Sequence, residues 1–459
     1  MVQDLAEFVV SRTTDDLSAD ALAVLKIRIV DALGCAIGAV EGEPIQAIRD
    51  HLDDFGGSPR CTAIAFGRTA PDRAAFYNAA LVRYLDFNDS YLAKGETCHP
   101  SDNIGAVLAA AEYAKRSGAD LLLALAVAYQ VQCRLSDVAP VRAKGFDHTT
   151  QGAYAVAAGV SKALGLDARK TANAVAISGT AFNALRVTRT GALSNWKGLA
   201  YPNTGFGGTH AAFLAMHGIT GPLEVFEGNK GFMDAIAGKF SIDWSKEDLE
   251  RVTRTIVKKY NAEVHSQSAT EGILELKAEH GFSADEVDRI EIDIFDVAFN
   301  IIGGGDEGSK YGVRTKEEAD HSLPYIVAAA LLDGTVMPAQ YAKERILRDD
   351  VQHLHRKVIV RVDRAYSTRF PAEMPCRIKV YLKAGQVLEK EKRDYEGFVT
   401  RPMSWPSVSA KFRSLAAPFV GEALRKQLVG AVSNLEKIQV AELVKSLAKI
   451  PKHRRSGSE

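Results

Sequence analysis

The chain has 459 residues, of which 25% are charged and 46% are hydrophobic. This composition is typical of a folded globular protein and excludes a collagen-like or disordered chain, and the length is enough for two or three domains with cores of their own. Lysine and arginine together number 57, as do aspartate and glutamate, so the formal net charge is zero, and we expect no nucleic-acid partner.

The compartment can also be predicted. The most apolar stretch, 121–131, is shorter than the roughly 20 residues that cross a bilayer, so we interpret it as part of a buried helix. The N-terminus carries acids early and lacks the basic start and apolar stretch of a secretory signal. Five scattered cysteines without a CxxC pair provide neither a disulfide framework nor metal ligands. We therefore expect a cytoplasmic protein without membrane contact or bound metal.

Helical periodicity dominates the first half of the chain. Apolar residues at helical spacing predict helices over 21–40, 74–84, 104–115, 119–132, 154–164 and 168–184. Asp102 lies just before the third of these and is a candidate N-cap. Their many alanines and glycines allow close helix packing.

The pattern changes after about residue 265. Apolar and polar residues alternate over 287–294 and 357–362, as in half-buried strands. Two further strands, 376–382 and 386–392, flank a predicted hairpin turn. Helical patterns return over 322–332, 339–347 and 407–447.

The fold predicted from these patterns is mostly α with an α+β second domain. The domains are a large helical domain over 1–265, a smaller α+β domain over 266–404, and a C-terminal helical segment over 405–459 that packs back on the helical domain.

Motifs of common cofactor and nucleophile sites are missing. The glycine-rich segments 205–208 and 303–305 do not match GxGxxG after a strand. The sequence also lacks GxxxxGK[ST], GxSxG and HExxH. We therefore expect neither a phosphate-binding loop nor an α/β-hydrolase nucleophile.

Chemistry-bearing residues gather instead in short polar segments, which are 84–90 with 99–103, 145–152, 186–197, 258–267 and 320–325. Histidine and tyrosine can move protons, and lysine and arginine can hold carboxylates, so this inventory indicates acid–base chemistry on a small polyanion. The alternative is that Asp89 and Asp102 cap helices and that the cations of 186–197 lie on a solvated loop.

These same segments carry a resemblance to a known family. LDFNDSYLAKGETCHPSDN (85–103), GFDHTTQGAYAVAAG (145–159), AEVHSQSATEG (262–272) and DHSLPYIVAAALLDG (320–334) are similar to motifs of the MmgE/PrpD family, most closely of its 2-methylcitrate dehydratase members. The resemblance covers most of the chain. It implies a helical domain plus a smaller α+β domain, a homodimer, a site in the cleft between the two domains, and chemistry without metal or cofactor.

The resemblance also implies which residues form the site. Catalytic roles fall on Asp86, His99, His148, Lys197 and Tyr325, and substrate binding on Ser90, Arg186, Lys258 and His265. Ser90 stands where many relatives have threonine, a change that keeps the hydroxyl. Thr149 stands where many relatives have proline.

Residues and resemblance together predict a hydro-lyase of propionate catabolism. It would remove water from 2-methylcitrate or a related 2-hydroxy tricarboxylate and give a cis-aconitate-type alkene. We expect Lys197 to stabilise the carbanion-like charge. His99 or His148 would protonate the departing hydroxyl. The other imidazole, or a Tyr325 made acidic by a neighbouring cation, would remove the carbon-bound proton, and Asp86 would orient one imidazole.

Two alternatives stand beside this hypothesis. The same scaffold hosts a cis-aconitate decarboxylase and an epimerase of an amino-dicarboxylate, both of which also transfer protons beside a carboxylate. The HPSDN ending and the AEVHSQS phrase favour the dehydratase. A non-catalytic tricarboxylate-binding protein is the alternative from another class, and the full set of imidazoles and the tyrosine count against it.

Overall fold

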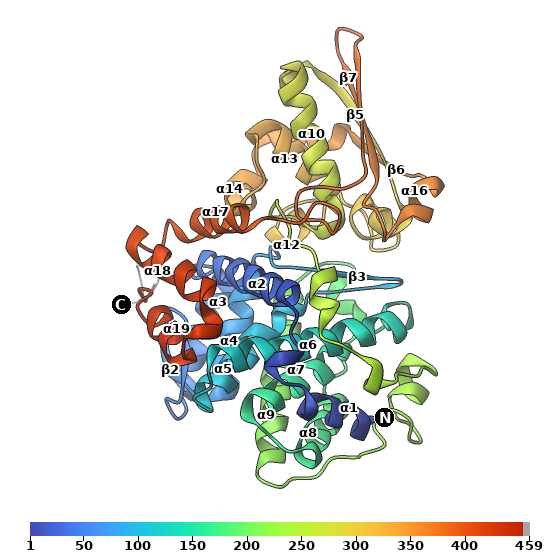
Figure 1. Cartoon of the computed structure of the whole chain (residues 1–459). Coiled ribbons are helices and arrows are strands. Elements are labelled where there is room, and N and C mark those ends of the chain that lie inside the picture. The colour runs from blue at the N-terminus through green and yellow to red at the C-terminus, as the bar shows by residue number, and fades with distance from the viewer. Residues whose placement is uncertain (453–459) are drawn as a thin grey trace. The chain divides into compact units, whose positions relative to one another are not determined.

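A computed structural model describes residues 1–452, which form two compact units (Figure 1). Unit 1 comprises residues 1–188, 198–255 and the chain from 404 onward, and unit 2 comprises 189–197 and 256–403. The end of the predicted C-terminal segment, 453–459, lies outside the described residues.

Unit 1 is built almost entirely of helices. They are α1 (Val2–Ser11), α2 (Ala19–Gly38), α3 (Glu43–Phe55), α4 (Pro71–Tyr84), α5 (Ile104–Tyr113), α6 (Gly118–Val138), α7 (Thr149–Leu164), α8 (Ala168–Ala181), α9 (Trp196–Met216), α17 (Trp405–Ala416), α18 (Glu422–Ser433) and α19 (Val440–Leu447). Its strands form two antiparallel hairpins, β1 (Cys61–Ala63) with β2 (Gly67–Thr69) and β3 (Tyr91–Ala93) with β4 (Glu96–Cys98).

Local sequence explains where several of these helices begin and end. Ser117 and Asp120 form a capping box at the start of α6, and the Asp167 side chain accepts a hydrogen bond of 2.8 Å from the Lys170 amide at the start of α8. Gly165, with a φ of 74°, ends α7 in the left-handed conformation that glycine adopts without strain.

Helix α6 lies in the core of unit 1. It continues past the predicted 119–132 to Val138, and by length and composition it is the one helix of residues 1–452 that could cross a membrane. The length of the apolar stretch alone thus does not exclude a membrane span, but the predicted burial of 121–131 is confirmed. Of its apolar window, 83% is buried inside the protein.

The C-terminal helix α17 packs along α2 (Figure 1). Gly34 on α2 allows the approach, because a Cβ there would lie 3.1 Å from the Phe412 Cα. Lys411 on α17 forms a buried ion pair of 2.6 Å with Asp31 and donates a hydrogen bond of 2.7 Å to the Phe87 carbonyl. The C-terminal segment thus supports the loop that follows α4.

Unit 2 contains a four-stranded sheet in the order β6-β5-β7-β8. Its strands are β5 (Val287–Ile294), β6 (Val358–Val362), β7 (Cys376–Leu382) and β8 (Val387–Lys392). Strand β5 runs parallel to β6 and antiparallel to β7, and β8 is antiparallel to β7. The longer helices α10 (Gln267–His280) and α13 (Leu323–Asp333) pack against the sheet, and shorter ones connect it: α11 (Asp296–Ala298), α12 (Lys316–Ala319), α14 (Lys343–Ile346), α15 (Asp349–Leu354) and α16 (Arg364–Arg369).

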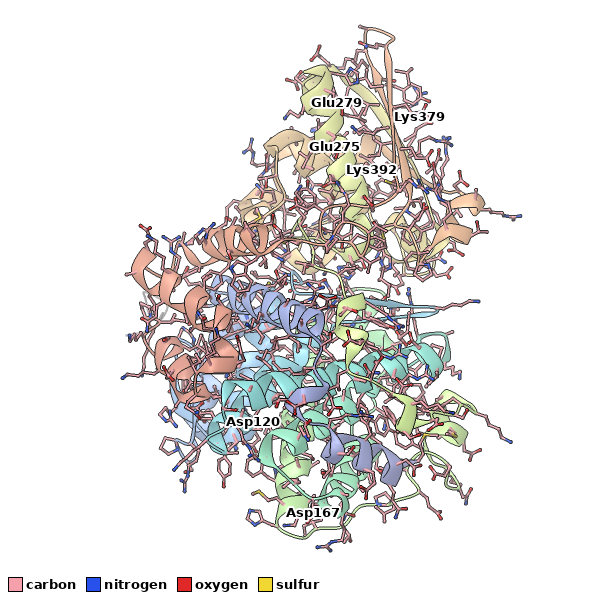
Figure 2. All side chains as sticks on the ribbon, in the orientation of Figure 1. Asp120, Asp167, Glu275, Glu279, Lys379 and Lys392 are labelled. Carbon is pink, nitrogen blue, oxygen red and sulfur yellow. The ribbon has the colours of Figure 1, made fainter. Side chains whose placement is uncertain are left out.

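Ion pairs join α10 to the edge strand β8 (Figure 2). Lys392 lies 2.9 Å from Glu271 and 2.7 Å from Glu275, and Lys390 pairs with Glu275 at 3.1 Å and with Glu279. These charged side chains lie on the edge strand, where unpaired backbone groups could form hydrogen bonds with a strand of another chain, and charges there disfavour such pairing.

The predicted fold class is confirmed, since unit 1 is helical and unit 2 mixes helices with a sheet. Residues 339–347 do not form one helix, however, because a 3₁₀ turn over Pro338–Tyr341 ends before α14 begins. The hairpin β3–β4 was not predicted, because its three-residue strands are too short to show an alternating pattern.

Close packing of α4 on α5 depends on Gly105. A Cβ at this position would lie 2.5 Å from the Ala79 amide nitrogen, and helix backbone cannot yield as a flexible side chain does. We expect Gly105→Ala to lower the free energy of unfolding by about 1–3 kcal/mol, measured by urea denaturation. The matched control is Gly430→Ala on α18, where a Cβ meets nothing within 4 Å; it should be neutral or stabilising by up to about 1 kcal/mol. Equal stability of the two variants would contradict this account.

Candidate functional site

The first polar segment of unit 1 begins where α4 ends. Asp86 has a φ of 54°, an uncommon backbone conformation for a residue other than glycine, and its carboxylate pairs with Arg83 in the last turn of the helix. This buried ion pair fixes the start of the loop. The expected role of Asp86 in orienting an imidazole stays a prediction.

A hydrogen-bond network joins the two ends of the segment 85–103. The Asn88 side-chain amide donates to Ser101 and to the Asp102 carboxylate, both at 2.8 Å. Asp102 was a candidate N-cap for α5, but the N-cap residue is Asn103, which makes no side-chain capping bond. The polar residues therefore close the β3–β4 hairpin at its base.

Asp89 is the buried acceptor in this network. Its carboxylate accepts hydrogen bonds from the Ser101 amide at 3.0 Å and from the Tyr129 hydroxyl at 2.8 Å, and Arg28 lies 3.9 Å away. Burial raises the pKa of Asp89, and the guanidinium and the hydrogen bonds only partly oppose that effect.

His99 is fixed by the same loop. Its Nδ1 lies 2.7 Å from the Asp89 carbonyl oxygen and 3.1 Å from the Ser90 hydroxyl. A carbonyl oxygen only accepts, so Nδ1 carries a proton and proton exchange with a substrate would take place at Nε2. The structure thus brings together Ser90 and His99, two of the predicted site residues.

His148 lies beside His99 at the start of α7. The two ring centroids are 5.5 Å apart in an edge-to-face arrangement, and the Tyr201 ring stacks on His148 at 6.1 Å. The His148 Nδ1 is 3.1 Å from the Asp147 carboxylate, and Arg186 approaches the same carboxylate at 3.9 Å. Asp147 is thus a carboxylate that interacts with the Nδ1 atom of an imidazole. Its position just before His148 was the available signal, which the sequence analysis did not use.

The surroundings of His148 contain buried polar atoms. The hydroxyls of Thr149 and Thr150 have no hydrogen-bond partner among residues 1–452. The Tyr201 hydroxyl donates to Asn103 and Gln132, each at 3.0 Å. Buried hydroxyls without a partner are rare in folded proteins, and these two are available to a polar ligand or to water.

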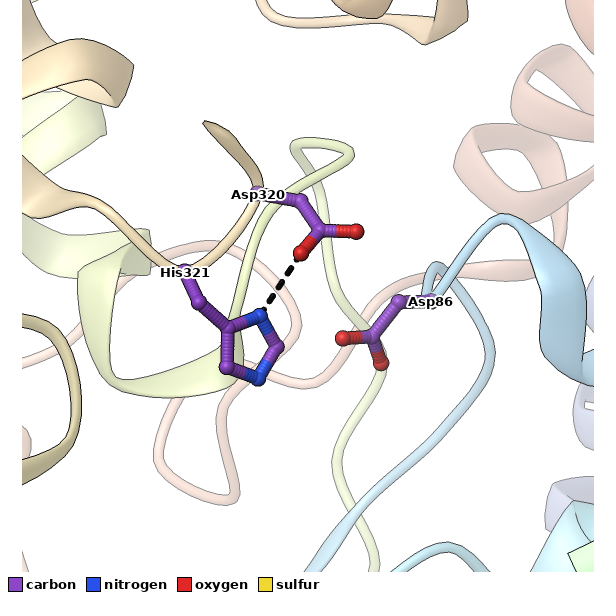
Figure 3. Close-up of side chains that lie close together, drawn as sticks. All are labelled: Asp86, Asp320 and His321. Atoms are coloured by element: carbon purple, nitrogen blue, oxygen red, sulfur yellow. Dashed lines mark hydrogen bonds and ion pairs between the residues drawn. The ribbon is translucent and has the colours of Figure 1, made fainter. Parts of the chain in front are cut away.

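In unit 2, Lys197 is held by a buried carboxylate. Its ammonium group lies 2.7 Å from Asp320 and 2.9 Å from the His321 Nδ1, and Asp320 and His321 are 2.7 Å apart (Figure 3). Lys316 contacts the other carboxylate oxygen at 2.8 Å. Burial disfavours the charged form of Asp320, but the two lysines and His321 outweigh it and hold the pKa well below its usual range.

A second histidine of unit 2 is anchored in a similar way. The His265 Nδ1 lies 2.7 Å from Glu263, which also accepts a hydrogen bond from the His265 amide at 2.7 Å. Nε2 of this buried ring has no hydrogen-bond partner among the described residues. Burial opposes ionisation of Glu263, but His265 and, less strongly, His321 and Lys258 lower its pKa to about 2.

Backbone contact joins this histidine to the Lys197 cluster. The Glu263 amide donates to the Asp320 carbonyl at 3.0 Å, and Lys258, which is fully buried, acts on the Glu263 carboxylate. Lys197, Lys258 and His265 therefore belong to one network in unit 2. Asp320 and His321, although present in the motif DHSLPY, were missed as site residues.

Tyr325 lies apart from these contacts. Its hydroxyl donates to the Gln340 carbonyl, and its ring neighbours Tyr341. Burial raises the pKa of Tyr325 and outweighs the opposing effect of Arg345. The direction is opposite to the acidic phenol that we expected, because desolvation penalises the phenolate more than the cation stabilises it.

Each of the two units thus contains imidazoles anchored through Nδ1, which are groups suited to proton transfer. Residues 3–245 match the MmgE/PrpD N-terminal domain, and residues 260–437 match the MmgE/PrpD C-terminal domain. The chain belongs to the MmgE/PrpD family.

Relatives within the family have different activities. The chain is 28% identical over 454 residues to a cis-aconitate decarboxylase of Mus musculus, a match that covers 93% of this chain and 88% of that protein. It is 26% identical over 424 residues to a mitochondrial 2-methylcitrate dehydratase of Yarrowia lipolytica, covering 86% and 79%. A fungal alkylcitrate dehydratase is 28% identical over 436 residues, covering 87% and 85%.

The low pKa of Glu263 predicts how the free energy of unfolding changes with pH. Its folded pKa of about 2 lies below the reference value of 4.5, so the Glu263 charge stabilises the protein above that reference and the contribution is lost as the pH falls toward 2. We expect Glu263→Gln to lower the free energy of unfolding at about pH 7, and the difference from the unsubstituted protein to shrink below about pH 4.5. Urea denaturation over this range measures it, with Glu344→Gln, at an exposed site, as the control. A difference that does not change with pH would contradict the assignment.

Proposed function

We propose that this enzyme is a hydro-lyase that removes water from 2-methylcitrate or a related 2-hydroxy tricarboxylate. The reaction breaks a C–H bond beside a carboxylate and the C–O bond of the hydroxyl, and it releases an alkene and water. It therefore needs one group that takes a proton from carbon and one that gives a proton to oxygen. Relatives with dehydratase activity on alkylcitrates support the proposal.

The observation that carries the proposal is the pair formed by His99 and His148. The rings lie 5.5 Å apart, but their Nδ1 atoms have different partners, a backbone carbonyl for His99 and the Asp147 carboxylate for His148. A carboxylate at Nδ1 stabilises the imidazolium that forms when Nε2 accepts a proton. In our proposal the neutral His148 therefore takes the carbon-bound proton at Nε2, and His99, protonated at both ring nitrogens, gives its Nε2 proton to the departing hydroxyl.

Lysines supply the electrostatic part of the proposal. Removal of a proton beside a carboxylate places negative charge on that carboxylate, and a cation fixed in position stabilises the charge as it develops. Lys197 fits this role because Asp320 and His321 hold its ammonium group in place. Lys258 and His265 belong to the same network and are proposed to bind a further carboxylate.

Decarboxylation of cis-aconitate is the second candidate. The mouse relative with that activity supports it, because the match extends over 93% of this chain. Loss of carbon dioxide leaves a carbanion that needs one proton donor, whereas loss of water needs a donor and an acceptor. Two imidazoles with different Nδ1 partners favour the reaction with two proton transfers.

A product assay distinguishes the candidates. The enzyme would be offered 2-methylcitrate, citrate and cis-aconitate separately, and the products would be identified by mass spectrometry. We expect the two hydroxy acids, 2-methylcitrate foremost, to lose water, and the activity to persist in the presence of a chelator. Release of carbon dioxide from cis-aconitate without water loss from either hydroxy acid would identify a decarboxylase. Binding of all three without any product would indicate a non-catalytic protein.

Substitutions test the roles of the imidazole pair. We expect His99→Ala and His148→Ala each to lower kcat by about 10²–10⁴-fold, because a positioned acid or base contributes that much. Asp147→Asn keeps the size of the side chain but removes the charge behind His148, so it should lower kcat while leaving KM nearly unchanged. The exposed His217 provides the control, His217→Ala, which should retain full activity. Normal turnover in both imidazole variants, with the fold intact by circular dichroism, would reject the assignment.

A further inference from the structure

Unit 2 contains a cavity of about 280 Å³ beside the Lys197 cluster. Its lining includes Lys310 and His321, the acids Glu307 and Glu318, and the apolar side chains of Leu193 and Val313. The volume lies just below the roughly 300–1,000 Å³ of pockets that bind drug-sized ligands, so it suits a small organic acid or one arm of a larger one.

Lys310 has no counter-ion in this cavity. Its side chain is half-buried, and its ammonium group has neither a hydrogen-bond nor an ion-pair partner within residues 1–452. By contrast, Lys197 and Lys316 each contact the Asp320 carboxylate. Burial lowers the pKa of Lys310, and Glu307, Glu263 and Asp320 only partly oppose the effect. A cation withdrawn from water without a partner is costly unless a ligand supplies the opposite charge.

The nearest acids are engaged elsewhere. Glu318 accepts hydrogen bonds from the Arg314 amide at 2.9 Å and the Thr315 amide at 3.1 Å, as part of the capping box of α12. Asp320 is shared by Lys197, Lys316 and His321. Glu318 and Asp320 thus already serve other groups, and Glu307, the remaining acid of the lining, acts on Lys310 only through its charge without forming an ion pair with it among residues 1–452.

The backbone of Lys310 is fixed next to the Lys197 cluster. Its carbonyl accepts a hydrogen bond of 2.6 Å from the Ser322 hydroxyl, which also accepts from the Tyr325 amide and so caps α13. His321, the residue before Ser322, lines the same cavity, and its Nδ1 contacts Lys197 and Asp320. Lys310 is therefore positioned in advance of any ligand.

We infer that this cavity is a carboxylate-binding subsite in which Lys310 is the counter-ion of one carboxylate of the substrate and His321 lies beside it. The identity of the ligand as a polycarboxylate rests on the proposed function. The subsite itself rests on the cavity, the cation without a partner and its anchored backbone.

The test uses propane-1,2,3-tricarboxylate, an inert probe that has neither a hydroxyl to lose nor an alkene. Calorimetry would measure its binding to the full-length enzyme and to Lys310→Met, which keeps the apolar stem and removes the charge. We expect the variant to bind the probe roughly 10- to 100-fold more weakly, because a hydrogen bond to a charged group is lost. The control Lys383→Met, at an exposed lysine of the same unit, should bind as the unsubstituted enzyme does.

Two dicarboxylates show which part of the ligand Lys310 contacts. Glutarate lacks the central carboxylate of the probe, and methylsuccinate lacks a terminal one. If Lys310 contacts one of these groups, the ligand without that group should lose affinity for the unsubstituted enzyme, and the Lys310→Met substitution should then have little further effect on it. An inorganic phosphate titration tests whether any small anion is sufficient.

Each outcome decides the inference. Equal affinity of Lys310→Met and the unsubstituted enzyme for the probe would overturn it, as would the absence of binding by the unsubstituted enzyme. Binding of phosphate as tight as that of the probe would also overturn a subsite built for a polycarboxylate. Thermal unfolding excludes a folding defect, since removal of an unpaired cation should leave the ligand-free Tm unchanged or higher. These measurements need no turnover, so failure of the dehydratase proposal in the product assay would be recognised separately.

Discussion

The carboxylate of Asp320 organises the polar centre of unit 2. An isolated charge of this kind could not remain buried, because the free energy needed to remove it from water exceeds the free energy gained from most single hydrogen bonds or ion pairs. Two lysines and a histidine share its two oxygens, and its backbone carbonyl accepts the Glu263 amide. The position of Lys197 and the location of the segment that carries His265 both depend on this one residue, the first through its carboxylate and the second through its backbone carbonyl.

Unit 1 also buries a carboxylate, that of Asp89, but surrounds it with different groups. Asp89 is buried among a tyrosine, an arginine and a backbone amide, and its own carbonyl orients His99. His148 depends on the neighbouring Asp147 instead. Two rings that lie almost in contact therefore experience different electrostatic surroundings, and the proposed roles of acid and base rest on this asymmetry.

The sequence predicted features that depend on neighbouring residues. The alternation over 287–294 identified β5, because the polarity of each residue indicates on which face of the strand it lies. His99 and His148 were predicted as site residues through the family resemblance, and the structure places their rings side by side. The contacts of Asp86 and the raised pKa of Tyr325 could not be obtained in this way. They depend on Arg83 and on the Gln340 carbonyl, and the balance between burial and charge is set by the folded surroundings. Lys310 was not singled out, because its distinguishing feature, an ammonium group without a partner among residues 1–452, cannot be predicted from the sequence.

The bond from Lys411 to the Phe87 carbonyl has a consequence for how the protein becomes functional. The two residues are 324 positions apart, and the lysine is synthesised long after the loop that it supports. A nascent chain in which α17 has not yet been made therefore lacks this support for the loop after α4. A variant without α17 would lose the same bond, and its loop would lack that support in the finished protein as well.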